Sequence, residues 1–263
     1  MSAWSGLERE LDAWRDEGRT ATFWLRDDDA CRDNDALQRL LRIADGHAVP
    51  LALAVIPAAL QPDLVAAIAS HAGVTVLQHG YAHANHAAPG TRACELGAER
   101  STAAVVQELA TGRARLAEAF GGRFLPALVP PWNRIDDGVV ARLPGEGYRG
   151  LSTFGARKAA LAAPGLAQCN AHVDPIAWRR DRAFIGTDQA LERTVAHLRA
   201  RREAGVDAQE PTGILTHHLA FDAPAWPFLD ELLARTRAHG AATWVGAHAI
   251  LDAAAAVTCA RSA

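Results

Sequence analysis

The feature that most constrains the fold is an alternation of two patterns along the chain. Short runs of apolar or β-branched residues are separated by longer segments whose apolar residues recur with helical spacing. This alternation favours βα units arranged around a mostly parallel sheet. The predicted strands are 22–25, 51–56, 74–78, 124–129, 150–154, 168–172, 213–217 and 242–245. The predicted helices are 34–46, 62–72, 99–120, 136–145, 188–204, 225–238 and 247–256.

Seven or eight strands with intervening helices predict a (β/α)7-8 barrel, closed or nearly closed. A chain of 263 residues that is 49% hydrophobic can bury one large core. We therefore expect a single domain over residues 1–263, in which 1–18 form an N-terminal helix and 19–263 form the barrel.

The overall charge excludes several classes of partner. The net charge is -3, and no block of Lys and Arg is present to attract nucleic acid or an anionic membrane. The first residues lack the pattern of a signal peptide, and no apolar run is long enough to span a bilayer. We expect a cytoplasmic protein that acts on a small molecule or a carbohydrate.

Polar and ionisable residues cluster where predicted strands end. In a βα barrel the carboxyl ends of the strands share one face, so the segments that follow them converge there. The residues in these positions are Arg26 to Asp29, His79, Pro130 to Asn133, His172 with Asp174, and His217 with His218.

The stretch QHGYAHANH places three of the eleven histidines within eight positions, at His79, His83 and His86. Neutral imidazole is a favoured zinc ligand, and two histidines with one carboxylate leave the open position that a catalytic site requires. The carboxylates come from the run Asp27 to Asp29, whose adjacent charges need a cation or donors to offset them. Alternatively, this run opens a loop or caps the next helix.

Two further clusters have both a structural and a functional interpretation. Pro130 and Pro131 hold a rigid turn that presents Trp132, either as a pocket wall or as a cap on the core. Strand alternation sends His217 and His218 to opposite sides, so one of them faces the mouth, where imidazole can donate a proton.

Together these motifs resemble the polysaccharide deacetylase family, which are metal-dependent carbohydrate esterases with a distorted βα barrel. The resemblance rests on the order of RDDDA, HGYAH, VPPWN and ILTHH, and extends from about residue 22 to residue 244. It implies Asp28 as the base and Asp29, His79 and His83 as ligands of Zn²⁺ or another divalent metal. It also implies His217 as the acid that protonates the leaving group.

The resemblance further implies substrate contacts from the turn, and it leaves several supporting residues open. The expected substrate-binding residues are Pro131, Trp132, Asn133 and Arg134. Those expected to support the ligands, or to replace an assigned residue, are Asp27, Asn85, His86, Asp174 and His218.

One position departs from the family pattern. The third family motif starts with an arginine that steadies the base, and here that position is Val129. Arg26 and Arg134 are the candidates to replace this arginine, and Asp174 is the nearest carboxylate to tune the acid.

The expected activity is removal of an acyl group, N-acetyl above all, from a sugar or related amide by metal-activated water. One alternative is a C–N hydrolase acting on a small non-sugar amide or ureide. Another is a catalytically silent barrel that binds a metal or a ligand.

Overall fold

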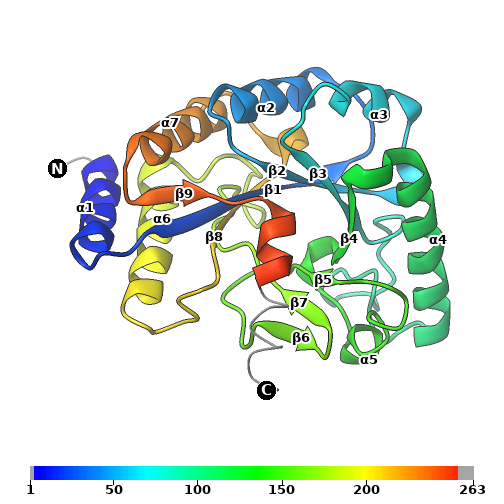
Figure 1. Ribbon diagram of the computed structural model, residues 1–263. Coiled ribbons are helices and arrows are strands. Elements are labelled where there is room, and N and C mark those ends of the chain that lie inside the picture. The colour runs from blue at the N-terminus through cyan, green and yellow to red at the C-terminus, as the bar shows by residue number, and fades with distance from the viewer. Residues whose placement is uncertain (1–2, 254–263) are drawn as a thin grey trace.

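The structure is a computed structural model that describes residues 3–253 (Figure 1). Its centre is a curved sheet in the order β6-β7-β5-β4-β3-β2-β1-β8, with β9 beside β1. The strands are β1 Ala21–Ala30, β2 Leu51–Val55, β3 Val74–His79, β4 Phe124–Val129, β5 Gly150–Leu151, β6 Leu161–Ala163, β7 Leu166–Gln168, β8 Thr212–Thr216 and β9 Ala242–Trp244. Neighbouring strands are parallel except for the β6 and β7 pair.

The mixed α/β architecture with a central parallel sheet is confirmed, but the sheet is not closed. Within residues 3–253, β6 and β8 form its two ends and do not pair with each other. The predicted strands 150–154 and 168–172 pair over only a few residues, and the short antiparallel hairpin of β6 and β7 ends the sheet on that side.

Helices cover the outer face of the sheet (Figure 1). They are α1 Ala3–Asp16, α2 Asp35–Gly46, α3 Pro62–Ile68, α4 Thr102–Phe120, α5 Asp137–Val140, α6 Thr187–Arg202 and α7 Ala225–Ala238. Short 3-10 turns include η3 Pro131–Asn133 and η4 His218–Ala220. Residues 247–253 are also helical, and the rest of the predicted helix 247–256 lies outside the described residues.

Local sequence explains where several helices begin and end. The side chain of Asn34 accepts a hydrogen bond from the N–H of Leu37 at 2.9 Å and so begins α2. The predicted helix 136–145 is reduced to the single turn of α5, because Pro144 cannot continue a hydrogen-bonded helix. Within the described residues, no helix is both long enough and apolar enough to cross a membrane.

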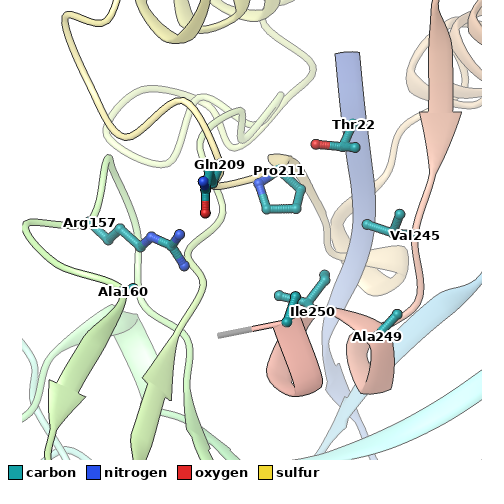
Figure 2. A pocket seen from close by; sticks show the side chains of 9 residues that line it. Thr22, Arg157, Ala160, Gln209, Pro211, Val245, Ala249 and Ile250 are labelled. Carbon is teal, nitrogen blue, oxygen red and sulfur yellow. The ribbon is translucent and has the colours of Figure 1, made fainter. Parts of the chain in front are cut away.

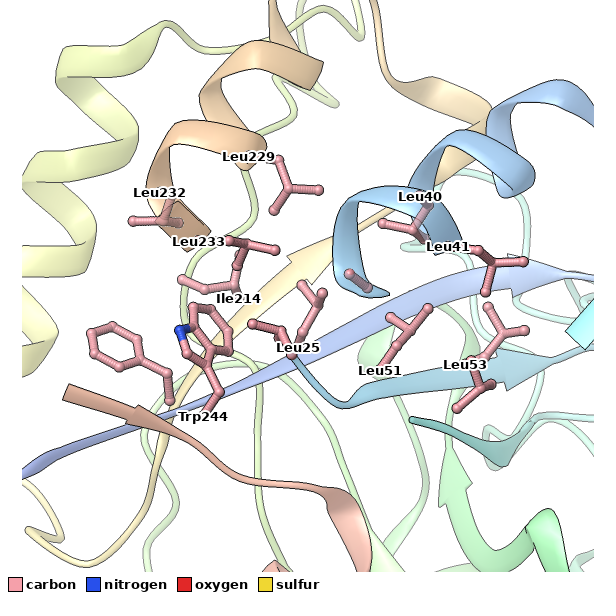
Figure 3. Packing of buried hydrophobic residues seen from close by; sticks show 14 of the residues in the cluster. Leu25, Leu40, Leu41, Leu51, Leu53, Ile214, Leu229, Leu232, Leu233 and Trp244 are labelled. Carbon is pink, nitrogen blue, oxygen red and sulfur yellow. The ribbon is translucent and has the colours of Figure 1, made fainter. Parts of the chain in front are cut away.

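Two apolar layers hold the sheet. On the outer face, leucines of α2 and α7 pack against side chains from four strands (Figure 3). The residues labelled there are Leu25, Leu40, Leu41, Leu51, Leu53, Ile214, Leu229, Leu232, Leu233 and Trp244. On the inner face, Ile250 and Leu251 of the segment 247–253 pack with Trp24, Leu77 and Leu125. The concave side of the open sheet is therefore filled by side chains and is not a channel.

Candidate metal and active site

Strand β1 carries the Asp run inside the sheet, although the sequence predicted that the strand would end before it. Successive side chains of a strand point to opposite faces. Trp24 belongs to the inner core cluster and Leu25 to the outer one. Continuing the alternation, Asp28 lines a pocket at the carboxyl end of the strand, whereas Asp27 contacts His218. Adjacent aspartates thus lie in different surroundings.

A bulge in β1 brings the third aspartate to the same mouth. The pairing of β1 with β2 shifts register between Asp27 and Ala30, and Asp29 has a φ of 72°. Its Oδ1 atom lies 3.1 Å from Nε2 of His79 and 3.2 Å from Nε2 of His83. The three side chains form one of two groups of possible metal ligands among the described residues.

His79 ends β3, and its other ring nitrogen fixes its orientation. Nδ1 lies 3.0 Å from the carbonyl oxygen of Val129, to which it donates, so in the neutral ring Nε2 carries the lone pair. His83 follows on a loop held by the buried carboxylate of Glu95, which accepts from the N–H groups of Tyr81 at 3.2 Å and Ala82 at 2.7 Å. The sequence argument did not identify Glu95.

The charge states of Asp29 and His83 fit a cation, whereas, against the effect of burial, the charges of Asp28 and Asp29 raise the pKa of His79, so that a metal there would replace a proton. Burial alone would raise the pKa of Asp29, but the hydrogen bond and charge of His79 hold it well below its usual value. Burial and the neighbouring His79 lower the pKa of His83, which favours the neutral ring. An ionised carboxylate and a neutral imidazole are the donors that a divalent metal takes.

Asp28 is held by Arg26, which is fully buried and comes from the same face of β1. Nη2 of Arg26 donates to Oδ2 of Asp28 at 3.0 Å, and Nε lies 2.9 Å from Oδ1. The guanidinium also donates to Ser152 Oγ at 2.7 Å and Asn133 Oδ1 at 2.8 Å. Of the two arginines considered from the sequence, Arg26 therefore contacts the carboxylate, whereas Arg134 donates to the carbonyl of Ala93 at 2.6 Å.

Asp27 and His218 form a separate buried pair. Oδ2 of Asp27 lies 2.6 Å from Nδ1 of His218, and Oδ1 accepts from the backbone N–H of His218 at 2.9 Å and from Thr216 Oγ1 at 2.7 Å. Although burial opposes it, the charge of Asp27 raises the pKa of His218. This pair does not line the pocket and ties β1 to the end of β8.

His217 faces the pocket, as alternation with His218 requires. Its Nε2 lies 4.0 Å from Oδ2 of Asp28, and its ring meets the Trp178 ring edge-on with centroids 4.7 Å apart. The indole N–H of Trp178 donates to Oδ2 of Asp174 at 2.6 Å. Burial raises the pKa of Asp174 above its usual value, against the opposing charge of His217. Trp178, which the sequence argument did not identify, thus lies between the expected acid and carboxylate.

The pocket has a volume of about 800 Å³. Of the expected substrate-binding residues, Trp132, Asn133 and Arg134 line it, whereas Pro131, the first residue of η3, is buried and does not line it. Asn85 and His86 do not line it. Instead, Asn85 Oδ1 accepts two backbone hydrogen bonds within its own loop, from Ala87 and Cys94.

Backbone strain concentrates around this pocket. Seven described residues other than glycine have a positive φ, and five of them line the pocket, namely Asp29, His83, Trp132, Asn133 and Arg182. Each such conformation costs on the order of 1 kcal/mol and persists only where its surroundings enforce it. This concentration is typical of a functional site.

The second group of possible metal ligands is His172, His197 and Glu210. Nδ1 of His172 accepts from the N–H of Gly213 at 2.9 Å, so in the neutral ring the proton is on Nε2, 3.3 Å from Glu210. A protonated nitrogen offers no lone pair to a metal, and Glu210 also accepts two backbone N–H groups. This cluster is a buried hydrogen-bonding network. The prediction that His172 lies at the mouth is wrong, because its ring belongs to this network and does not line the large pocket.

A smaller pocket of about 210 Å³ lies at the opposite end of the sheet (Figure 2). Thr22 and Pro211, near the first residues of β1 and β8, line it together with Ile250 and Arg157. It contains none of the candidate metal ligands.

Comparison with known proteins places the fold. No family model matches the chain, and no curated sequence does. Among solved structures, that of a Mycobacterium smegmatis protein assigned as a polysaccharide deacetylase superposes on this chain with a TM-score of 0.66 at 20% identity. The match covers 85% of this chain and 78% of the other.

Two further structures cover most of both chains. A family 4 acetyl xylan esterase from Clostridium thermocellum, in complex with a cobalt ion, matches with a TM-score of 0.56 at 14% identity, over 88% of this chain and 91% of that one. A peptidoglycan deacetylase from Bacillus subtilis matches with a TM-score of 0.57 at 13% identity, over 93% and 95%. The protein therefore has the fold of the polysaccharide deacetylases, with its sheet left open.

Proposed function

We propose that this protein is a metal-dependent hydrolase that removes an acyl group from an amide, most readily an N-acetyl group from an amino sugar. The observation that carries the proposal is the convergence of Asp29, His79 and His83 beside Asp28, an aspartate clamped by a buried arginine. The two aspartates thus have different partners: Asp29 lies beside two imidazoles and Asp28 beside a guanidinium.

Asp29, His79 and His83 would hold the metal, which, when bound, acidifies water and polarises a carbonyl group. Asp28 acts as the base and takes a proton from the attacking water. The water oxygen bonds to the carbonyl carbon, and the bond from carbon to nitrogen breaks. His217 protonates the departing amine, which leaves a carboxylic acid and a free amino group.

The turn of η3 supports the developing negative charge. The N–H groups of Asn133 and Arg134 are bonded within the turn, to the carbonyls of Pro130 at 2.8 Å and Pro131 at 3.3 Å. The N–H of Trp132 is the candidate donor to the oxyanion. Trp132 itself has a left-handed conformation, with a φ of 54°.

A sugar fits the pocket better than a small ureide does. The volume of about 800 Å³ is several times that of an acetamide group, and Trp132, Trp178 and Phe154 line it. Phe154 and Trp178 are among the exposed large hydrophobic residues, with 45% and 41% of their surface accessible. Exposed aromatic faces are suited to stacking on a sugar ring.

The test combines metal content with release of acetate from N-acetylglucosamine oligomers. Wild type should carry about one equivalent of zinc or cobalt, His79→Ala should lose both metal and activity, and Asp28→Asn should keep the metal and lose activity. His86→Ala is the matched control, because this exposed histidine of the same loop does not line the pocket. Metal binding without hydrolysis of any acylated substrate would favour the catalytically silent barrel instead.

A further inference from the structure

The outer part of the large pocket carries four arginines. Arg134, Arg179, Arg182 and Arg193 line it together with the candidate metal ligands. Arg179, Arg182 and Arg193 are exposed and Arg134 is half-buried, whereas Asp28 at the metal end is buried. The pocket therefore runs from a buried hydrolytic end to an arginine-rich mouth.

Two of these arginines are presented by an ordered hairpin. A bridge between Ile176 and Phe184 closes the segment 176–184, and the N–H of Ala177 donates to the carbonyl of Ala183 at 2.9 Å. The N–H of Arg182 donates to the carbonyl of Ala177 at 3.2 Å. Arg179 and Arg182 thus project from a folded loop.

The other two arginines are anchored from different elements. Nη1 of Arg193, on α6, donates to the carbonyl of Asp174 at 3.0 Å, and Nη1 of Arg134 donates to that of Ala93. Because carbonyl oxygens accept these bonds, each guanidinium is positioned while its positive charge stays available.

These four arginines form no ion pair with any described carboxylate. Over the described part of the chain, none of the four arginines has a carboxylate oxygen within 4.0 Å, whereas Arg100 and Arg235 each form such ion pairs. The whole chain has a net charge of -3, so the positive mouth is a local feature. Asp28, Asp29 and Asp174 line the same pocket, but none of them forms an ion pair with these four arginines. A cluster of unpaired arginines in a concave site attracts anions.

We propose that the substrate is an acylated amino sugar that carries a phosphate group, with the acyl group at the metal and the phosphate at the arginine mouth. This inference rests on the proposed function. Guanidinium groups pair with phosphate through two parallel hydrogen bonds, and a phosphate oxygen array can engage two arginines at once. Trp178, next to Arg179 in the sequence, offers the ring face that would bridge the two ends.

The experiment compares kcat/KM for deacetylation of N-acetylglucosamine, its 1-phosphate and its 6-phosphate by metal-loaded enzyme. Wild type should favour at least one phosphate by about tenfold or more, a preference that declines as salt rises. Arg179→Gln and Arg182→Gln should each remove most of that preference. Arg180→Gln is the matched control, because Arg180 lies in the same hairpin and does not line this pocket.

Equal kcat/KM for the neutral and phosphorylated sugars would overturn the inference and leave the proposed function standing. So would an equal loss of preference in Arg180→Gln and Arg182→Gln. If wild type hydrolyses none of the three sugars, the proposed function fails for this class, and calorimetric binding decides the inference. Phosphate-dependent binding weakened in Arg182→Gln but not in Arg180→Gln supports an anion site, and binding indifferent to phosphate overturns it.

Discussion

Replacing Arg26 tests whether its buried guanidinium orients the base Asp28. The family pattern gives this role to an arginine at the position that is Val129 here. Arg26→Gln removes the guanidinium that contacts both carboxylate oxygens of Asp28, and it takes away the donor to Ser152 Oγ and Asn133 Oδ1. Removing one partner of a buried ion pair typically costs about 3–5 kcal/mol of folding free energy. Because Asp28 would also lose its orientation as a base, we expect kcat/KM to fall by roughly a hundredfold or more.

The matched control for this variant is Arg201→Gln. Arg201 is equally buried and donates four hydrogen bonds, at Thr22, Thr212 and Ala208, far from the pocket. Its replacement should lower the unfolding free energy, measured by urea titration, but leave the activity per folded molecule near that of wild type. If Arg26→Gln, assayed where it is folded, kept kcat/KM within about threefold of wild type, the assignment of Arg26 would be refuted.

Three further outcomes are expected. His217→Gln should slow amide hydrolysis by about a hundredfold but affect p-nitrophenyl acetate much less, because p-nitrophenolate leaves without a proton; equal losses would count against an acid role. Gly80→Ala should lower metal affinity measured by competition with a chelator, because a Cβ there would meet the Glu95 carboxylate and lie 2.6 Å from Pro131, at a φ of 55°; unchanged affinity would contradict this. Burial lowers the pKa of His197 from 6.5 to about 3, so the unfolded chain binds the proton first and stability declines as pH falls below 6.5. Between pH 6.5 and 5 His197 should contribute a loss of about 1.6 kcal/mol, and His197→Gln should remove this contribution, as urea titrations at the two pH values would show.

The sequence predicted the layered architecture well because its strands and helices differ in apolar spacing. The strand at 124–129 and the helix at 225–238 have the predicted bounds. The open edge was not predictable, because the short strands β5, β6 and β7 are defined by pairing with distant segments and not by their own composition. Local patterns identify an element but do not determine which partners it finds.

The sequence also indicated several of the residues that meet at the mouth, but not Trp178, and not how the neighbouring aspartates divide between two settings. Strand alternation separated His217 from His218 in advance, and the same rule would have separated Asp27 from Asp28 if β1 had been extended far enough. The contribution of Asp29 depends on a bulge, and that of Glu95 on a loop that folds back over sixteen positions from His79. Such backbone geometry leaves no periodic signal.

The inner core has a consequence for how the chain folds. Trp24 near one end of the sequence is covered by Ile250 and Leu251 near the other, and Leu251 leaves no room for a side chain at Gly150. Contacts between such distant positions close late, because the entropy of a large loop must be overcome first. During synthesis on the ribosome, the concave side of the sheet should therefore stay exposed to solvent and to chaperones until the segment 247–253 has been made and packs against it.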